Sequence, residues 1–188
     1  MRVGCVILAA GNARRFGANK LLAPYRGRAL AEWALDAALA AGLEPVAVVT
    51  QYPAVEALAL ARGFEICRND RPELGISRSV ALGAEALASR CGGLLFLAAD
   101  QPRLSPGTLK KLAEDFDADP EGIVAAAAGE RRGNPAVFPA ALCPELQALT
   151  GDRGGMQLIR RYPERVRWLP VPPEELADVD SPADLEAL

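Results

Sequence analysis

The chain has 188 residues, 51% of them hydrophobic and 5% aromatic, which fits a single domain with a substantial core. Its formal net charge of -3 excludes a broad attraction for nucleic acid or for anionic lipid, so any cations that bind an anionic ligand must be local. Because the sequence contains no histidine, it excludes histidine-based triads, histidine general bases and histidine metal ligands.

The first predicted element is a buried strand over 3–9, and the loop that follows it, over 11–20, carries two glycines and three cations. Glycines and free backbone N–H groups beside fixed positive charge are what a polyphosphate needs. The loop fits neither the P-loop pattern nor the dinucleotide-binding pattern, however. Phosphate binding and a basic surface turn therefore both remain open at this point.

Strands and helices are predicted to alternate along the rest of the chain, until a segment rich in glycine and proline over 129–144 interrupts the pattern. This alternation predicts an α/β fold: one three-layer α/β/α, Rossmann-like domain with a mostly parallel sheet and an irregular insertion in its second half. The further strands are expected over 45–50, 63–67, 93–99, 123–128, 135–138 and 166–171. The helices are expected over 30–41, 54–61, 76–87, from 106 to about 116, in two stretches after the irregular segment, and from 182 onward.

Asp100 ends the apolar run of the strand over 93–99, and Gln101-Pro102 follows it. A carboxylate at the end of a strand is well placed to hold Mg²⁺, which prefers one or two carboxylates together with substrate phosphates. A turn or helix-cap role fits Asp100 equally well. Because ligands of such sheets bind beyond the carboxyl ends of the strands, Asp100 and the loop over 11–20 are expected to share one cleft.

Three other polar segments have a structural as well as a functional interpretation. Ser77 and its neighbours begin a helix, where they can contact an anion or only cap the helix. The basic turn over 131–135 either meets a second anionic substrate or is a solvated loop. The aspartates around Ser181-Pro182 fit capping charge at a helix start.

The four cysteines are scattered and form no C-x-x-C pair, which favours reduced core residues in a cytoplasmic protein over a disulfide. No segment is long and apolar enough to span a membrane, and the N-terminus has no signal-peptide pattern. We therefore expect neither a membrane nor a nucleic acid as a partner.

Taken together, the blocks of the chain resemble the MobA-like NTP transferase family, and within it most closely the molybdenum cofactor cytidylyltransferases. Their order and spacing carry the resemblance over nearly the whole chain. The blocks are Leu8-Ala9-Ala10-Gly11, Arg15-Phe16-Gly17, Lys20, Gly75-Ile76-Ser77, Ser79-Val80, Asp100-Gln101-Pro102, Gly133-Asn134-Pro135-Ala136-Val137-Phe138, Gly151-Asp152, Gly154 and Asp178-Val179-Asp180-Ser181-Pro182.

The resemblance implies transfer of CMP from CTP to molybdenum-bound molybdopterin, which gives the cytosine dinucleotide cofactor and pyrophosphate. It also implies Mg²⁺, with Mn²⁺ as a substitute, and a transient contact with the molybdoenzyme that receives the product or with its chaperone. Residues 1–100 would mainly bind the nucleotide, and residues 101–188 would bind the acceptor and complete the sheet. Such a reaction needs no histidine, because the attacking phosphate oxygen is already anionic.

The same resemblance assigns roles to individual residues. The implied catalytic residues are Arg15, Lys20 and Asp100. The implied nucleotide-binding residues are Leu8, Ala9, Ala10, Gly11, Arg15, Lys20, Gly75 and Ser79. The implied metal ligands are Asp100 and Asp180, and the implied acceptor-binding residues are Gln101, Arg132 and Asn134.

Three alternatives remain open from the sequence. Leu8-Ala9-Ala10-Gly11, Asn19-Lys20-Leu21-Leu22 and Gln101 favour CTP, but a guanylyltransferase that uses GTP has the same general signature. A transferase that acts on a sugar phosphate or a polyol phosphate would differ only in its acceptor pocket. A carrier or insertion chaperone without catalytic activity would keep the fold, but it would not need the cations and carboxylates of a triphosphate site.

Overall fold

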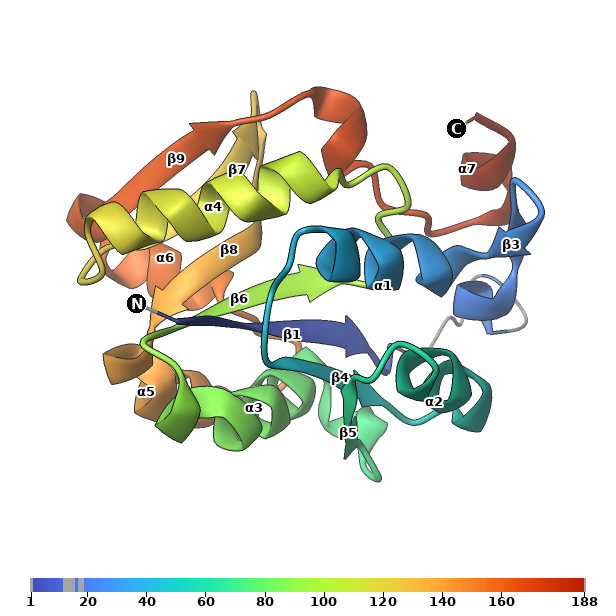
Figure 1. Ribbon diagram of the computed structural model, residues 1–188, viewed down its shortest axis with the longest axis horizontal. Coiled ribbons are helices and arrows are strands. Elements are labelled where there is room, and N and C mark those ends of the chain that lie inside the picture. Colours follow the sequence, from blue (N-terminus) through green and yellow to red (C-terminus); the bar gives the residue numbers. More distant parts are fainter. Residues whose placement is uncertain (1, 12–15, 17–18, 188) are drawn as a thin grey trace.

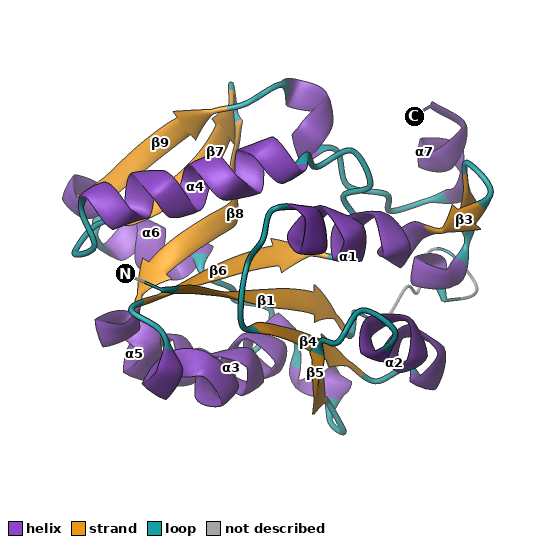
Figure 2. Ribbon diagram, in the orientation of Figure 1, coloured by secondary structure: helices purple, strands orange, loops and turns teal. Residues whose placement is uncertain are grey.

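The structure is a computed structural model that describes residues 2–11, 16 and 19–187. Its centre is a seven-stranded sheet with the order β5-β4-β1-β6-β8-β7-β9 (Figures 1 and 2). The strands are β1 (Val3–Ala9), β4 (Val46–Thr50), β5 (Glu65–Arg68), β6 (Gly93–Ala98), β7 (Ile123–Ala128), β8 (Arg131–Pro139) and β9 (Val166–Pro170). Within this sheet β8 pairs antiparallel with β6 and β7 and the other described pairs are parallel, so the prediction of a mostly parallel sheet is confirmed.

Helices cover both faces of this sheet, which confirms the predicted three-layer arrangement (Figure 2). One apolar cluster lies between the sheet and α1 (Leu30–Ala40), α2 (Pro53–Leu60) and α4 (Pro106–Ala118). A second cluster lies on the other face, against α3 (Ile76–Leu87), α5 (Cys143–Gln147) and α6 (Met156–Arg161). A short hairpin of β2 (Pro24–Tyr25) and β3 (Arg28–Ala29) and the last helix, α7 (Pro182–Ala187), complete the regular elements.

Local sequence signals explain several of the boundaries. Ser105 caps α4 by accepting a hydrogen bond from the Thr108 N–H, as its Ser-Pro signal predicts. Gly42, at φ 69°, lies directly after the Ala41 cap that ends α1. Val6 and Ile7 of β1 are fully buried, which agrees with a strand that is covered on both faces.

The expectation of an irregular segment over 129–144 is wrong, because most of it is the nine-residue strand β8. This strand forms an antiparallel hairpin with β7, and Gly129 supplies the left-handed conformation at the turn. The pairing shifts register between Ala125 and Ala127, opposite the Gly133–Pro135 stretch. Proline cannot donate to a ladder and glycine suits a bulge, so these residues mark an interruption within a strand.

The chain order places the site at one edge of the sheet. From β1 the chain proceeds to β4 and β5 on one side, and then returns to β6 on the other side of β1. This reversal makes a topological switch point at the carboxyl ends of β1 and β6, where ligands of open α/β sheets bind. The residues after β1 and Asp100 after β6 meet at this point, as the sequence predicts.

A network of charged side chains joins α1 to the end of α2. Arg62 donates from Nε to Asp36 Oδ1 at 2.5 Å and from a terminal nitrogen to Glu32 Oε2 at 2.9 Å. Arg28 also bonds to both carboxylates. The bond from Arg62 keeps the pKa of Glu32 below its ordinary value, against the effect of burial. Burial tends to raise the pKa of Asp36, but its bonds to the two arginines outweigh burial and lower it.

Replacing Arg62 by methionine is expected to lower the free energy of unfolding at pH 7 by about 1–3 kcal/mol, because two carboxylates lose their donor. A carboxyl whose pKa is lower in the folded than in the unfolded state stabilises the fold at pH values above its unfolded pKa, here 4.5 for Glu32 and 3.8 for Asp36. This stabilisation is lost as the pH falls through the folded pKa values. Urea unfolding should therefore show a difference between Arg62→Met and the parent chain that is largest above about pH 5. The difference should shrink steadily on acidification.

The matched control is Arg68→Met. Arg68 pairs with Glu56, but its side chain is 69% exposed, so its loss should change stability by less than about 0.5 kcal/mol. Equal losses for the two variants would contradict a structural role of the partly buried network.

Candidate active site

A cavity of about 410 Å³ opens at the carboxyl ends of β1 and β6, and we call it the first cavity. It brings together every predicted nucleotide-binding residue that the structure describes, although these come from two distant parts of the chain, 8–20 and 75–79. Its lining is Leu8, Ala9, Ala10, Gly11, Lys20, Leu21, Pro72, Glu73, Gly75, Ile76, Ser79, Ala98, Asp100 and Asp152. Arg15, predicted to be catalytic, lies outside the described residues.

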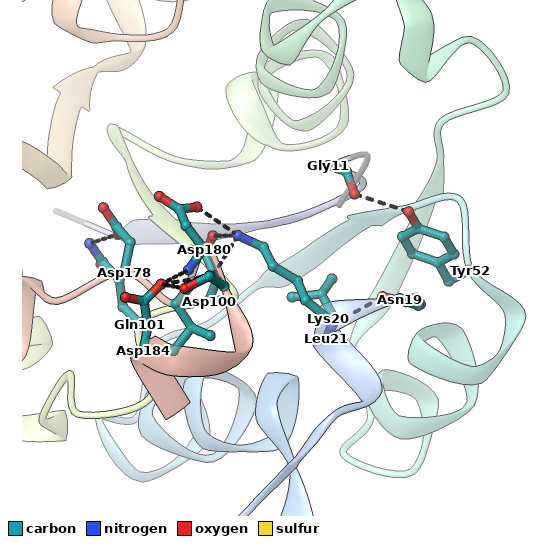
Figure 3. A network of polar contacts seen from close by, with 12 residues as sticks. Gly11, Asn19, Lys20, Leu21, Tyr52, Asp100, Gln101, Asp178, Asp180 and Asp184 are labelled. Carbon is teal, nitrogen blue, oxygen red and sulfur yellow. Dashed lines mark hydrogen bonds and ion pairs between the residues drawn. The ribbon is translucent and has the colours of Figure 1, made fainter. Parts of the chain in front are cut away.

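Three consecutive side chains at the end of β4 fix the backbone at the end of β1 and just after it. The Thr50 hydroxyl donates to the Ala9 carbonyl at 3.0 Å, the Gln51 amide donates to the Ala10 carbonyl at 2.8 Å, and the Tyr52 hydroxyl donates to the Gly11 carbonyl at 3.0 Å. Figure 3 shows the last of these bonds. This support could not be predicted, because nothing in the Thr50-Gln51-Tyr52 tripeptide indicates its partners 41 residues away.

Lys20 is the centre of the polar contacts in the first cavity (Figure 3). Its Nζ donates to Asp100 Oδ2 at 2.6 Å, to the Val179 carbonyl at 2.7 Å and to Asp180 Oδ1 at 3.1 Å. An ammonium group has three N–H donors, so each of them has an acceptor. Burial tends to lower the pKa of Lys20, but the charges and hydrogen bonds of Asp100 and Asp180 raise it above its ordinary value.

Several contacts hold the aspartate segment at its place beside Lys20. The Val179 N–H donates to the Asp100 carbonyl at 3.0 Å, which joins the segment to the end of β6. Asp184 Oδ2 accepts hydrogen bonds from the N–H groups of Asp180 and Ser181 and from the Ser181 hydroxyl. Asp184 is therefore a capping residue, in agreement with the structural interpretation of this segment.

Asp178 faces Gln101, which donates from Nε2 to Asp178 Oδ1 at 2.8 Å. Burial and the nearby charge of Asp100 raise the pKa of Asp178 above its ordinary value. A carboxylate only accepts hydrogen bonds, so it fixes the orientation of the Gln101 amide. Asp178 thus positions Gln101, a role that the sequence analysis did not assign.

A second cavity of about 640 Å³ lies beside this aspartate segment and the start of β8. The predicted acceptor-binding residues Gln101, Arg132 and Asn134 all line it, and so does Asp180. The Arg132 guanidinium lies 5.5 Å from the centre of the Trp168 ring, which supports the side chain through a cation–π contact. The second cavity, whose lining contains Arg131 and Arg132 together with Glu130 and three aspartates, therefore lies next to the first one, with Asp100 and Gln101 adjacent in sequence at their boundary.

The carboxylates near Lys20 fit a small divalent cation. Asp100 and Asp180 already share one cation, the Lys20 ammonium, and Asp100 Oδ1 is buried without a hydrogen-bond partner. Among the described residues no group of three or more histidine, cysteine, aspartate or glutamate side chains could hold a metal ion. Two carboxylates that need substrate phosphates to complete the coordination are the donor set that Mg²⁺ prefers.

The first cavity also contains Glu73 and Asp152, neither of which the sequence analysis assigned to a site. Asp152 belongs to the Gly151-Asp152 turn, whose motif was part of the family resemblance but had no role.

The described part of the chain contains no helix of the length and apolarity needed to cross a membrane.

The sequence profile of the MobA-like NTP transferase domain matches residues 5–166 of this chain. Nicotine blue oxidoreductase from Paenarthrobacter nicotinovorans is 34% identical over 87% of this chain and 82% of that protein. The probable molybdenum cofactor guanylyltransferase of Trichormus variabilis is 30% identical over 97% of this chain and 88% of that protein. The bifunctional protein GlmU from Pelobacter propionicus is 40% identical over 58% of this chain, but the match covers only 25% of GlmU.

Solved structures resemble this chain over nearly its whole length. A nucleotidyl transferase from Methanothermobacter, Mth528, superposes with a TM-score of 0.87 at 25% identity, over 99% of this chain and 95% of the other. Rv0371c from Mycobacterium tuberculosis superposes with a TM-score of 0.84 at 26% identity, over 100% and 96% of the two chains. A structure of Rv0371c has also been solved in complex with manganese.

Proposed function

This chain belongs to the MobA-like NTP transferase family, and from that premise we propose that it transfers CMP from CTP to molybdenum-bound molybdopterin and releases pyrophosphate. The observation that carries the proposal is the Lys20–Asp100–Asp180 cluster, which lies where a strand-end cavity for a nucleotide meets a second cavity that contains two arginines. A nucleotidyltransferase needs this arrangement, because donor and acceptor must meet at one phosphorus atom.

The proposed step is an in-line displacement at the α-phosphorus of the triphosphate. An oxygen of the acceptor phosphate forms the new P–O bond, and the bond to the bridging oxygen of the β-phosphate breaks. Pyrophosphate leaves with that electron pair. No strong general base is required, since the attacking oxygen is already anionic, so alignment and positive charge supply the catalysis.

Lys20 supplies positive charge at the boundary of the two cavities. It now donates all its hydrogen bonds to Asp100, Asp180 and the Val179 carbonyl, and contact with a triphosphate would replace one or more of them. Asp100 and Asp180 would hold Mg²⁺, or Mn²⁺ in its place, and the metal would neutralise charge on the phosphates. In the second cavity, Arg132 would hold an anionic group of the acceptor, and Gln101 and Asn134 would contact its polar edges.

The base and the acceptor separate this proposal from its alternatives. The Leu8-Ala9-Ala10-Gly11 motif and Gln101 support CTP, whereas the Trichormus variabilis relative is named as a guanylyltransferase. A sugar phosphate or polyol phosphate would use the same Lys20 and Asp100 and a different contact in the second cavity. A carrier without turnover is disfavoured, because it would not need the paired carboxylates and the lysine.

The test is pyrophosphate release from CTP, GTP, ATP and UTP, each with and without molybdopterin-bound molybdenum, in the presence of Mg²⁺. The expected result is release from CTP only when the acceptor is present. Release from GTP would move the protein to the guanylyltransferases, and release with a phosphorylated sugar or polyol would move it to another branch. Binding of the acceptor without release from any triphosphate would support the carrier and contradict the proposal.

A further inference from the structure

The first cavity has two carboxylates in its wall beside Gly75 at the start of α3, Glu73 and Asp152. Asp152 comes from the second half of the chain, in the turn between α5 and α6. Glu73 lies 4.0 Å from Arg71, as a weak and exposed ion pair. Within the described residues no hydrogen bond or ion pair involves the Asp152 carboxylate, so its oxygens are available to a ligand.

Close contacts fix the position of Asp152 at the start of α3. The Ser77 N–H donates to the Gly151 carbonyl at 3.2 Å. Gly75 has a φ of +87°, and a Cβ at this position would lie 2.5 Å from Gly151 backbone atoms and 2.6 Å from Asp152 Oδ1. Only glycine lets the turn approach this closely, so the backbone on both sides holds Asp152 at the cavity wall.

Charge decides which part of a nucleotide can lie beside Asp152. A triphosphate is attracted to Lys20, which lies beside Asp100 and Asp180, and is repelled by the Glu73 and Asp152 carboxylates beside the start of α3. The uncharged base is therefore the part of the nucleotide that reaches the Gly75–Ser79 end. This orientation agrees with the positions of Gly75 and Ser79, which the family resemblance assigns to nucleotide binding.

We propose that the Asp152 carboxylate accepts a hydrogen bond from the exocyclic amino group of the base, and that this bond selects CTP, which has the amino group, against UTP, which lacks it. A carboxylate can only accept hydrogen bonds. Cytosine presents an amino donor at C4, where uracil presents a carbonyl acceptor. Uracil would place two acceptors against each other, and the bound base would take water away from the exposed Asp152 carboxylate without giving it a donor, which is the basis for rejection. This inference rests on the proposed nucleotidyl transfer and adds the residue that selects the base.

The test compares kcat/KM for CTP and UTP in the parent chain and in Asp152→Asn, with the acceptor held constant. Asparagine has nearly the same shape, but its NH₂ group can donate to the C4 carbonyl of uracil. The CTP-to-UTP ratio is expected to fall at least about tenfold in the variant, with a loss for CTP and a gain for UTP. Equilibrium binding of the two nucleotides, measured by calorimetry without acceptor, should show the same change in ratio.

Glu73→Gln is the matched control, because it removes the other carboxylate of the same wall and should change the ratio less than about threefold. An Asp152 that only stabilises the start of α3 would give a lower melting temperature in Asp152→Asn with an unchanged ratio, and that result would overturn the proposal. An equal change of the ratio in both variants would also overturn it, since it would reflect the overall charge of the wall.

Failure of this inference can be distinguished from failure of the proposed function. If the parent chain releases pyrophosphate from CTP and the ratio is insensitive to Asp152, the function stands and the assignment of Asp152 is wrong. If the parent chain uses GTP, the proposed CTP specificity is wrong. The assignment is then tested with ITP, which lacks the 2-amino group of guanine: an unchanged GTP-to-ITP ratio in Asp152→Asn would overturn it.

Discussion

Asp100→Asn is expected to lower kcat by about a thousandfold, because the variant removes the negative charge that Lys20 contacts and that would hold the proposed divalent cation. Asp100 lies two residues after the end of β6 and bonds to Lys20 at 2.6 Å. Its second oxygen, Oδ1, is buried without a partner, so the neutral amide would present an NH₂ or an oxygen of lower charge where a cation is needed. Pyrophosphate release with CTP, acceptor and Mg²⁺ measures the effect.

The same variant should keep its fold, since asparagine has nearly the same volume and Lys20 retains the Val179 carbonyl as an acceptor. Far-ultraviolet circular dichroism and the melting temperature check this expectation. Glu114→Gln on α4 is the control, because the Glu114 side chain is 55% exposed and its ion pair with Lys110 is long, at 3.9 Å. Full activity of Asp100→Asn would disprove the metal and catalytic assignments together.

Much of the sheet could be predicted because each buried strand is a continuous apolar run with clear limits. The run over 3–9 predicts β1 with its observed bounds, and Ser105-Pro106 predicts the start of α4. The strand β8 was predicted too short, because Gly133 and Pro135 signal a break when they are read locally. They stand instead at a shift in register, which depends on the neighbouring strand and is invisible in the local pattern.

The meeting of Lys20, Asp100 and Asp180 could also be predicted, because strand ends in a parallel sheet converge and the family motifs occur in order. The Val179 carbonyl could not be predicted as a third partner of Lys20, because a main-chain carbonyl has no side-chain signal in the sequence. Asp152 was missed for a related reason: its turn is held beside the first cavity by contacts such as the backbone hydrogen bond between Ser77 and Gly151. Contacts made by main-chain atoms across 74 or more residues leave no trace in local composition.

Lys20→Met is expected to lower kcat/KM for CTP by about a hundredfold or more, with a smaller change in the KM for the acceptor. The variant removes the positive charge at the boundary of the two cavities and leaves Asp100 and Asp180 facing each other without their shared cation. Lys20→Arg should recover only part of the activity. A planar guanidinium cannot direct its donors to three acceptors that converge on one nitrogen.

The pH dependence of stability gives an independent test of the Lys20 contacts. Because the folded pKa of Lys20 is raised above its ordinary value of 10.5, its contribution is fully present below that value and is lost only as the pH rises through the folded pKa. The exposed Asp180 contributes little, and the shielded pair with Asp100 contributes about 1–3 kcal/mol. Urea unfolding without added metal should therefore show a difference between the parent chain and Lys20→Met that is constant from about pH 7 to 10 and decays above it. A difference that already declines near neutral pH would mean that Lys20 lacks the carboxylate contacts on which its proposed role depends.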